Sequence, residues 1–217
     1  MQSKTVSRKL LKRLPLYLNY LKSLPEDFQN VSATAMARAL ELGDVQVRKD
    51  LAKVSATGRR RTGRNRHQLM QDIESYLNFA EETGTIVVGA GKLGRALLDY
   101  VGFEEAGFNV MAGFDIDPCA DVSAGGKPIY PINRLEHFCR HYNVHIGVIA
   151  VPAESAQNVC DCLVSCGISA IWNFAPVHLQ VPDFVTVQSE NLAVSLTSLR
   201  VQMKNQHTER TTMNQAI

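Results

Sequence analysis

The stretch from Thr85 to Asp117, TIVVGAGKLGRALLDYVGFEEAGFNVMAGFDID, contains a glycine-rich turn between two apolar runs. The β-branched run from Thr85 to Val88 leads directly into the turn, Gly89-Ala90-Gly91-Lys92-Leu93-Gly94, and an amphipathic stretch follows. The second apolar run ends at Phe114, immediately before Asp115. This order of strand, turn, helix, strand and acidic residue predicts a βαβ unit of the kind that binds a dinucleotide.

Each glycine of the turn has a distinct physical role in such a unit. Gly89 permits the tight turn, Gly91 lets the backbone approach a pyrophosphate, and Gly94 lets the helix pack closely on the strand. The first amides of the helix and the helix dipole favour the negative charge of the phosphates. The alternative is a glycine-rich strand-to-helix turn that binds nothing.

The acidic residue after the second strand indicates which dinucleotide is bound. Asp115 follows the turn by about twenty residues, where a carboxylate accepts hydrogen bonds from the ribose hydroxyls. Its charge would repel the 2′-phosphate of NADP, so the expected cofactor is NAD(H). The residues of this unit expected to bind it are Gly89, Ala90, Gly91, Lys92, Leu93, Gly94, Asp115 and Ile116.

The distribution of charge divides the chain into a basic N-terminal part and an acidic remainder. Residues 1–80 contain 15 Lys and Arg against 7 Asp and Glu, whereas residues 81–217 contain 8 against 14. A length of 217 residues allows two modest domains, each with its own core. The basic part predicts nucleic acid as a binding partner.

The five cysteines indicate neither a metal site nor a disulfide framework. Their number is odd, none belongs to a CxxC pair, and no histidine lies at a useful spacing from Cys160, Cys162 and Cys166. We interpret these three as small residues of an amphipathic helix, with metal ligation as the alternative. Because the sequence shows no signal peptide or long apolar span, we expect a cytoplasmic protein with reduced thiols.

The N-terminal region has helical periodicity. Pro15 would start a new helical segment or kink one, and Pro25 closes the element. The apolar positions that recur at helical spacing after Ser7 are Leu10, Leu11, Leu14, Leu18 and Leu21.

Two further helices are predicted on either side of Gly43. Ser32 is the expected N-cap of a helix over residues 33–42, and Asp44 can cap a second helix over residues 45–52. Two helices joined by a tight glycine-containing turn form a helix-turn-helix, whose second helix enters the DNA major groove.

Side chains suited to DNA recognition lie on and after the second of these helices. Gln46 can contact adenine, and Arg48 and Lys49 can contact guanine or phosphate. The arginine-rich stretch from Thr57 to His67 is typical of the hairpin wing of a winged helix, with a solvated charged loop as the alternative. The expected DNA-binding residues are Ser32, Gln46, Arg48, Lys49, Arg59, Arg60, Arg61 and Arg64.

Apolar strands alternate with amphipathic helices in the rest of the chain, which predicts a parallel sheet. Residues 144–151 form a continuous apolar run, as expected for a strand that is buried on both faces. Val151 and Pro152 end this run, and Asn173 and Phe174 leave the next strand, at the sheet edge where ligands of such folds bind.

We therefore predict an α/β fold with a winged helix-turn-helix domain followed by a Rossmann-type domain. A helix over residues 191–203 has leucines on one face, which could cover its own sheet or a partner subunit. The predicted boundaries are 1–80 for the DNA-binding domain, 81–189 for the NAD(H)-binding domain, 190–206 for a C-terminal dimerisation helix and 207–217 for a disordered tail.

With these parts placed, the sequence resembles the Rex family of bacterial redox-sensing transcriptional repressors, over nearly the whole chain. The stretches that carry the resemblance are Arg13–Leu18, Gln46–Leu51, Val88–Leu98, Ile149–Ala153 and Trp172–Val177. The resemblance implies a homodimer that exchanges its last helix between subunits and leaves double-stranded operator DNA when NADH rises.

The resemblance also implies that Tyr100 lies near the nicotinamide and that Asn173 to Pro176 line its pocket.

Many members of the family have arginine where Asn19 stands and aspartate where Asn191 stands, and the family pattern pairs these two across the dimer. Two asparagines can still form a hydrogen bond, but without assistance from charge. This difference suits either a weakened contact or a paralogue with an altered ligand response.

The wing also departs from the family pattern. The chain has Val54-Ser55-Ala56-Thr57-Gly58 and an arginine cluster where the family usually has a phenylalanine–glycine repeat and a Gly-x-Gly-Tyr turn. Because the recognition helix retains its base-contacting residues, we expect the changed wing to shift affinity, salt dependence or flanking preference.

Two other function classes remain open. A small NAD-dependent oxidoreductase would need a general acid or base at the sheet edge, where His145, His178 and Tyr100 are isolated candidates. A winged-helix regulator could also keep the Rossmann-type domain for structure, or bind NAD(H) without a switching response. A repressor that senses the NADH/NAD+ ratio requires no chemistry and is the function we expect, so no catalytic residue is predicted.

Overall fold

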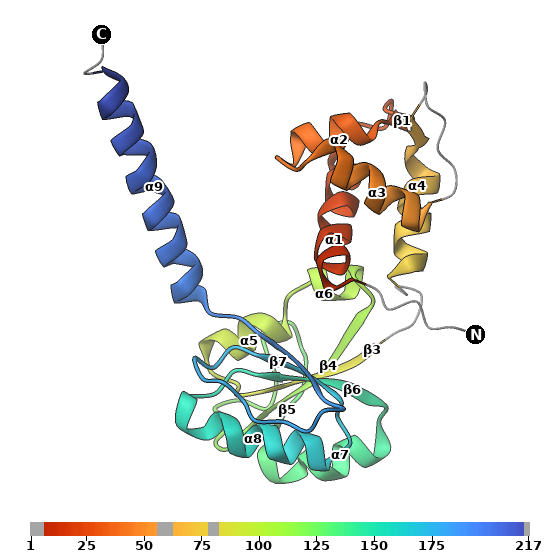
Figure 1. Ribbon diagram of the computed structural model, residues 1–217. Helices are drawn as coiled ribbons and strands as arrows, with labels where there is room; N and C mark the ends of the chain where they lie inside the picture. The colour runs from red at the N-terminus through yellow and green to blue at the C-terminus, as the bar shows by residue number, and fades with distance from the viewer. Residues whose placement is uncertain (1–6, 56–62, 78–82, 215–217) are drawn as a thin grey trace. The chain divides into compact units, whose positions relative to one another are not determined.

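The computed structural model describes residues 7–55, 63–77 and 83–214 (Figure 1). The chain divides into two compact units, Met1–Glu81 and Glu82–Ile217, and each is described by itself. In the described residues we find no helix whose length and hydrophobicity would let it cross a membrane.

The N-terminal unit contains a helix-turn-helix. Helices α2 and α3 pack against each other, and the turn between them contains Gly43, as predicted. The elements of this unit are α1 (Arg8–Ser23), β1 (Asn30–Val31), α2 (Ala33–Ala39), α3 (Asp44–Val54), β2 (Arg64–Asn65) and α4 (Arg66–Tyr76).

Helix α1 supplies one wall of the core of this unit. Leu11 is 40% exposed and lies outside the core, so its predicted place on the apolar face is wrong. Helix α1 also runs through Pro15 as one helix, so Pro15 does not start a new segment. Proline removes one backbone hydrogen bond, and the helix continues through it with Leu14 and Leu18 buried on its core side. The buried residues of α1 are Leu10, Leu14, Tyr17, Leu18 and Leu21.

The predicted helix caps are partly correct. The hydroxyl oxygen of Ser32 accepts a hydrogen bond from the backbone N–H of Ala35 at 3.0 Å, which confirms it as the N-cap of α2. The prediction that Asp44 caps α3 is wrong, because Gly43 is the N-cap and Asp44 lies inside the first turn. There its carboxylate accepts a hydrogen bond from the hydroxyl of Thr34 at 2.9 Å.

The short strand β2 lies within the stretch predicted as the wing, Thr57 to His67. It pairs antiparallel with β1, which precedes α2, and Val31 stands opposite Arg64. Gly63 has a φ of 75°, and a Cβ there would stand 2.7 Å from the carbonyl oxygen of Val31. Arg59, Arg60 and Arg61 of the predicted wing lie outside the described residues.

The second unit is built on a parallel six-stranded sheet with the order β5-β4-β3-β6-β7-β8. Figure 1 shows α5 on one face and α7 and α8 on the other. The order reverses between β3 and β6, which is the switch point where α/β sheets bind ligands. The strands are β3 (Thr83–Val88), β4 (Phe108–Asp115), β5 (Ile129–Pro131), β6 (Val144–Ile149), β7 (Ala170–Asn173) and β8 (Thr186–Ser189).

The helices of this unit differ in places from the prediction. The single helix expected after the glycine turn is split into two short helices, and Val101 lies between them. Strand β5 was not predicted, because three residues carry too little periodicity to reveal a strand. The helices are α5 (Lys92–Leu98), α6 (Gly102–Glu105), η1 (Ile132–Arg134), α7 (Leu135–His141), α8 (Ala153–Ser165) and α9 (Leu192–Asn214).

Two apolar clusters lie on opposite faces of the sheet. One joins Ile86, Val88 and Ile149 to α7 and α8, and the other joins Val87 and Val148 to α5. The alternation of neighbouring residues between the clusters is what a strand buried on both faces requires. The sheet edge between the faces is therefore held rigidly.

Helix α9 continues to Asn214, so the prediction of a disordered tail from residue 207 is wrong over most of its length. The sequence beyond Met203 is polar, which motivated that prediction. Polarity does not end a helix, because Gln, Glu, Lys and Arg are all good helix formers, and this stretch contains neither glycine nor proline.

Candidate nucleotide-binding and DNA-binding sites

The glycine turn joins β3 to α5 with the geometry that the spacing predicts. Gly89 has a φ of 98°, in the left-handed region that favours glycine. A Cβ on Gly94 would stand 1.7 Å from the carbonyl oxygen of Gly89, which confirms that Gly94 allows close packing of helix and strand. A Cβ on Gly91, the N-cap of α5, would meet no atom of the described residues within 4 Å. The space above the helix N-terminus is therefore open to a ligand.

Asp115 ends β4 beside this turn. One carboxylate oxygen accepts a hydrogen bond from the backbone N–H of Ala90 at 2.6 Å, and the other accepts from Asp117 N–H at 3.1 Å. The side chain thus braces the glycine turn in addition to any contact with a ribose. Each oxygen has a second lone pair that can accept a further hydrogen bond.

A cavity of about 210 Å³ opens at the carboxyl edge between β3, β4 and β6. The sequence analysis missed Ile132, Ser155 and Val159, which reach the cavity from η1 and α8. No periodicity signals such residues, because they are far from the turn in sequence. The predicted cofactor residues that line the cavity are Gly89, Gly91, Asp115, Ile116, Val151 and Pro152.

The remaining predicted cofactor residues do not line this cavity. Asn173 is fully buried, and its amide N–H groups donate to the carbonyl oxygens of Ala175 and Val177 at 3.1 and 2.9 Å. Asn173 therefore orders the loop after β7. The other residues outside the cavity are Ala90, Lys92, Leu93, Gly94, Tyr100 and Phe174.

Tyr100 belongs to a chain of aromatic rings at the same end of the sheet. Its side chain is 59% exposed, and its ring centroid lies 4.8 Å from that of Phe103. Phe103 contacts Trp172 at 5.6 Å, and Trp172 contacts Phe174 at 4.6 Å. Tyr100 also lines a second cavity of about 220 Å³. The structure therefore leaves the Tyr100 ring accessible.

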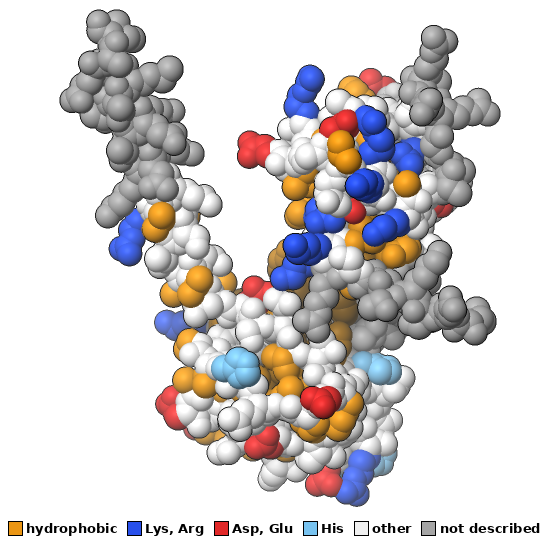
Figure 2. Space-filling view, viewed as in Figure 1, with side chains coloured by type: hydrophobic (Ala, Val, Ile, Leu, Met, Phe, Trp, Pro, Cys, Tyr) orange, Lys and Arg blue, Asp and Glu red, His pale blue; other side chains and the backbone are white. Residues whose placement is uncertain are grey.

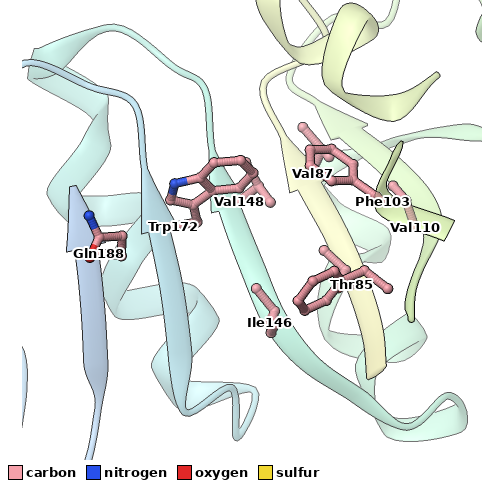
Figure 3. Close-up of a pocket in the computed structure, with 9 residues that line it drawn as sticks. Thr85, Val87, Phe103, Val110, Ile146, Val148, Trp172 and Gln188 are labelled. Atoms are coloured by element: carbon pink, nitrogen blue, oxygen red, sulfur yellow. The ribbon is translucent and has the colours of Figure 1, made fainter. Parts of the chain in front are cut away.

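An apolar hollow of about 300 Å³ occupies the sheet face on the side of α6 (Figure 3). Trp172, Val148 and Val87 project into it from neighbouring strands, and Phe103 adds its ring from α6. Among the described residues, no titratable side chain lines it. The hollow offers contact area for an apolar partner and no acid or base for chemistry.

Helix α3 presents a polar face to solvent. Val47 and Leu51 are fully buried and anchor the helix, while Gln46, Arg48 and Lys49 are exposed. The predicted DNA-binding side chains therefore share the accessible side of the helix. Figure 2 shows Lys and Arg side chains gathered on the N-terminal unit.

Val45 belongs to the same accessible side of α3 and was not predicted. Its side chain is 62% exposed at the second position of the helix. An exposed valine carries no motif, so only the structure reveals it.

Arg48 forms an exposed ion pair with Asp44 at 2.6 Å, and such a pair contributes little to stability.

Arg64 differs from the other predicted DNA-binding residues. Burial lowers the pKa of its guanidinium group, against the opposing charge of Asp72. Its buried Nε atom has no hydrogen-bond partner among the described residues. The side chain is therefore partly packed into its own unit, whereas Arg48 and Lys49 are exposed.

The two predicted switch residues are both exposed. The side-chain oxygen of Asn191 accepts a hydrogen bond from the backbone N–H of Val194 at 3.0 Å, at the start of α9. Asparagine is a preferred residue at a helix N-terminus. Asn191 therefore has a structural role within its own chain.

The thiols of α7 and α8 are packed into the sheet cluster. Cys160 is fully buried, which confirms it as a small core residue. Burial raises the pKa of the Cys139, Cys160, Cys162 and Cys166 thiols. Within the described residues, no group of three or more His, Cys, Asp or Glu is placed to hold a metal ion.

The helix-turn-helix and the dinucleotide turn together define a class of protein, a DNA-binding regulator with a nucleotide-binding domain. Family models agree with this division. Residues 5–52 match a family described as "Putative DNA-binding protein N-terminus", and residues 80–177 match "CoA binding domain".

Relatives and solved structures identify the family. The chain is 36% identical to "Redox-sensing transcriptional repressor Rex" of Porphyromonas gingivalis, covering 90% of each chain. It is 37% identical to the Rex repressor of Treponema denticola, covering 89% of this chain and 93% of the relative. The crystal structure of RSP, a Rex-family repressor, in complex with β-NAD+ and operator DNA has a TM-score of 0.85 at 30% identity, covering 96% of this chain and 97% of that one. The chain belongs to the Rex family of redox-sensing transcriptional repressors.

Proposed function

We propose that this protein is a homodimeric, operator-binding repressor whose affinity for DNA falls when NADH binds. The observation that carries this proposal is the combination of an open, Asp115-braced glycine turn with an exposed recognition helix in one chain. RSP of the same family has been crystallised with NAD+ and operator DNA, and separately with NADH.

The residues of the glycine turn fit a dinucleotide. The open space at Gly91 would receive the pyrophosphate, and the first backbone amides of α5 would donate hydrogen bonds to it. The free lone pairs of Asp115 would accept hydrogen bonds from the ribose hydroxyls, and its charge favours NAD(H) over NADP. When bound, the nicotinamide supplies two oxidation states that the protein must distinguish.

The DNA-binding face would consist of α3 and the predicted wing. Lys49 and Arg48 would contact guanine or phosphate from the exposed side of α3, with Ser32, Gln46 and Arg64 as further contacts. Arg59, Arg60 and Arg61 are proposed as wing contacts on the sequence alone. Because operator DNA and free NAD(H) meet in the cytoplasm of a bacterium, we expect the protein there.

Helix α9 supports the proposal of a homodimer. One stripe of exposed apolar side chains contains Leu192, Leu196, Leu199 and Met203, and a second contains Val194 and Val201. A helix with apolar residues on two sides is expected to lie between two surfaces. The apolar hollow beside Trp172 is one such surface in a second copy of the chain.

The lining of the 210 Å³ cavity supports a role without catalysis. In the part of the chain that the structure describes, no His, Lys, Cys or Tyr side chain lines the 210 Å³ cavity, and Asp115 is its one carboxylate. Both Asp115 oxygens already accept backbone hydrogen bonds, which leaves it poorly placed as a general base. This arrangement favours a sensor of the ligand over an oxidoreductase.

A second candidate function is a Rex-like regulator that binds NAD(H) without a switching response. The exposed Asn19 and Asn191 favour it, because the charged pair of the family pattern is absent. Titration of NADH, and separately NAD+, into the protein bound to the RSP operator duplex distinguishes the two. Release by NADH at much lower concentration than NAD+ supports the redox sensor, and release by neither supports the second candidate.

A further inference from the structure

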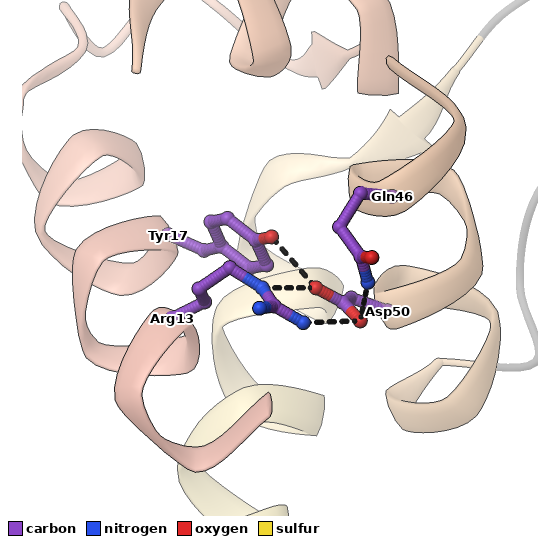
Figure 4. Close-up of polar contacts among 4 residues, drawn as sticks. All are labelled: Arg13, Tyr17, Gln46 and Asp50. Atoms are coloured by element: carbon purple, nitrogen blue, oxygen red, sulfur yellow. Dashed lines mark hydrogen bonds and ion pairs between the residues drawn. The ribbon is translucent and has the colours of Figure 1, made fainter. Parts of the chain in front are cut away.

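Asp50 is a buried carboxylate at the centre of the N-terminal unit, on the same helix as the predicted base contacts (Figure 4). It is 2% exposed, and it accepts hydrogen bonds from Arg13 Nε and Nη2 at 2.6 and 3.1 Å. The hydroxyl of Tyr17 donates to it at 2.9 Å, and Nε2 of Gln46 donates at 2.8 Å. Helices α1 and α3 are thus joined through one carboxylate.

The carboxylate of Asp50 is ionised and can only accept hydrogen bonds. Burial alone would raise the pKa of Asp50, but hydrogen bonds from Arg13, Tyr17 and Gln46 lower it below its ordinary value. Burial raises the pKa of Tyr17 to about 12, so its hydroxyl keeps its proton and remains a donor. Every group that faces the carboxylate therefore donates to it.

This arrangement determines the orientation of the Gln46 amide. The oxygen and nitrogen ends of a glutamine side chain have the same shape and are assigned from their partners. Next to an ionised carboxylate, only the NH₂ end of Gln46 is favourable. The carbonyl oxygen of Gln46 then points away from Asp50, and it accepts no hydrogen bond within the described part of the chain.

Gln46 is the third residue of α3, in the first turn of the recognition helix, and it is exposed. Residues at the N-terminal end of such a helix contact base edges in the major groove. A carbonyl oxygen there can accept from adenine N6 or cytosine N4, whereas guanine O6 and thymine O4 would repel it.

We propose that Gln46 selects adenine or cytosine at one position of the operator through its carbonyl oxygen, with Asp50, Arg13 and Tyr17 as positioning residues. This inference rests on the proposed function, because it assumes that α3 enters the major groove. A glutamine side chain alone could either donate a hydrogen bond to a base or accept one. The inference says that Gln46 accepts one.

The test measures a base-preference profile. The wild-type protein and its variants are titrated against the RSP operator duplex and a set of duplexes in which each base pair is replaced in turn. Gln46→Met keeps the size of the side chain and removes the acceptor. We expect it to lose about fivefold to tenfold selectivity at one base pair in each half-site, with the other positions unchanged.

Asp50→Asn tests the positioning role. An asparagine can donate as well as accept, so the Gln46 amide is free to turn and present either end. We expect selectivity between amino-bearing and carbonyl-bearing bases to relax at the position that Gln46→Met identifies. Thermal unfolding of each variant checks that it is folded. If Asp50→Asn does not fold, the result for Gln46→Met decides the proposal.

Gln68→Met is the matched control. Gln68 donates from Nε2 to Asp72 at 3.0 Å across the same four-residue spacing, but on α4. Its profile should match that of the wild type. Specific binding by the wild type with a profile that Gln46→Met leaves unchanged overturns this proposal alone. Absence of specific binding by the wild type overturns the proposed function and this inference with it.

Discussion

The substitution of alanine for glycine at two positions of one motif should have different consequences. Gly91 is the N-cap of α5 and Gly94 is its third residue, and both were predicted from the same glycine motif. Gly94→Ala should destabilise the fold, whereas Gly91→Ala should leave the fold nearly intact and weaken NADH binding. The difference follows from what each new Cβ would meet.

The magnitude follows from the distances at each position. A Cβ on Gly94 would stand 1.7 Å from the Gly89 carbonyl oxygen, and real Cβ atoms essentially never approach closer than 3.0 Å. The obstacle is backbone, so helix and turn must separate. Overpacking of this kind costs about 2–3 kcal/mol, which lowers the melting temperature of a domain of this size by about 6–12 °C.

Gly91 gives the opposite balance. Its Cβ would meet nothing within 4 Å, and its φ of −69° suits alanine. Replacing glycine by alanine at the N-cap lowers the free energy of unfolding by about 1 kcal/mol or less. The methyl group would occupy the space above the first amides of α5, so we expect NADH to bind at least about tenfold more weakly, or about 1.4 kcal/mol.

Thermal unfolding by circular dichroism and NADH titration by fluorescence measure the two effects on the same samples. The reasoning is refuted if Gly91→Ala unfolds as easily as Gly94→Ala. It is equally refuted if Gly91→Ala binds NADH as the wild type does, because the open space would then not be the pyrophosphate site.

Three further predictions concern the N-terminal unit and α9. Because hydrogen bonds lower the pKa of Asp50 below 3.8, its contribution to stability is present above that pH and is lost as the pH falls through the folded-state value. Asp50→Asn should therefore flatten the acid side of the pH profile of the melting temperature, and an unchanged profile would contradict the ionised network. Lys49→Ala should weaken operator binding and, if Lys49 contacts phosphate, reduce the slope of log K against log salt by about 1; NADH affinity, measured by fluorescence, should stay the same. Replacing Leu196 and Leu199 together by aspartate should convert the proposed dimer to monomers in sedimentation equilibrium, because both side chains are exposed within one chain; a dimer of unchanged mass would place the interface elsewhere.

The sequence by itself was sufficient for features that depend on local spacing. The spacing of Gly89, Gly91 and Gly94 predicted a strand-to-helix turn, because the structural roles of the three glycines depend only on residues close to them in sequence. Ser32 was identified as an N-cap for the same reason, since the capping bond spans three residues. The sequence also predicted the order of the elements and membership of the Rex family, because the motifs occur in a fixed order along the chain.

Tertiary structure alone decided which distant groups meet. Arg13 and Asp50 are 37 residues apart, and no periodicity joins them, yet their pairing sets the orientation of Gln46. Asp115 was predicted as a ribose ligand, but only the fold shows that it also braces the backbone at Ala90. The cavity side chains Ile132, Ser155 and Val159 come from elements that the sheet order brings to one edge. Local propensity acts over a few residues, whereas these contacts depend on how whole elements pack.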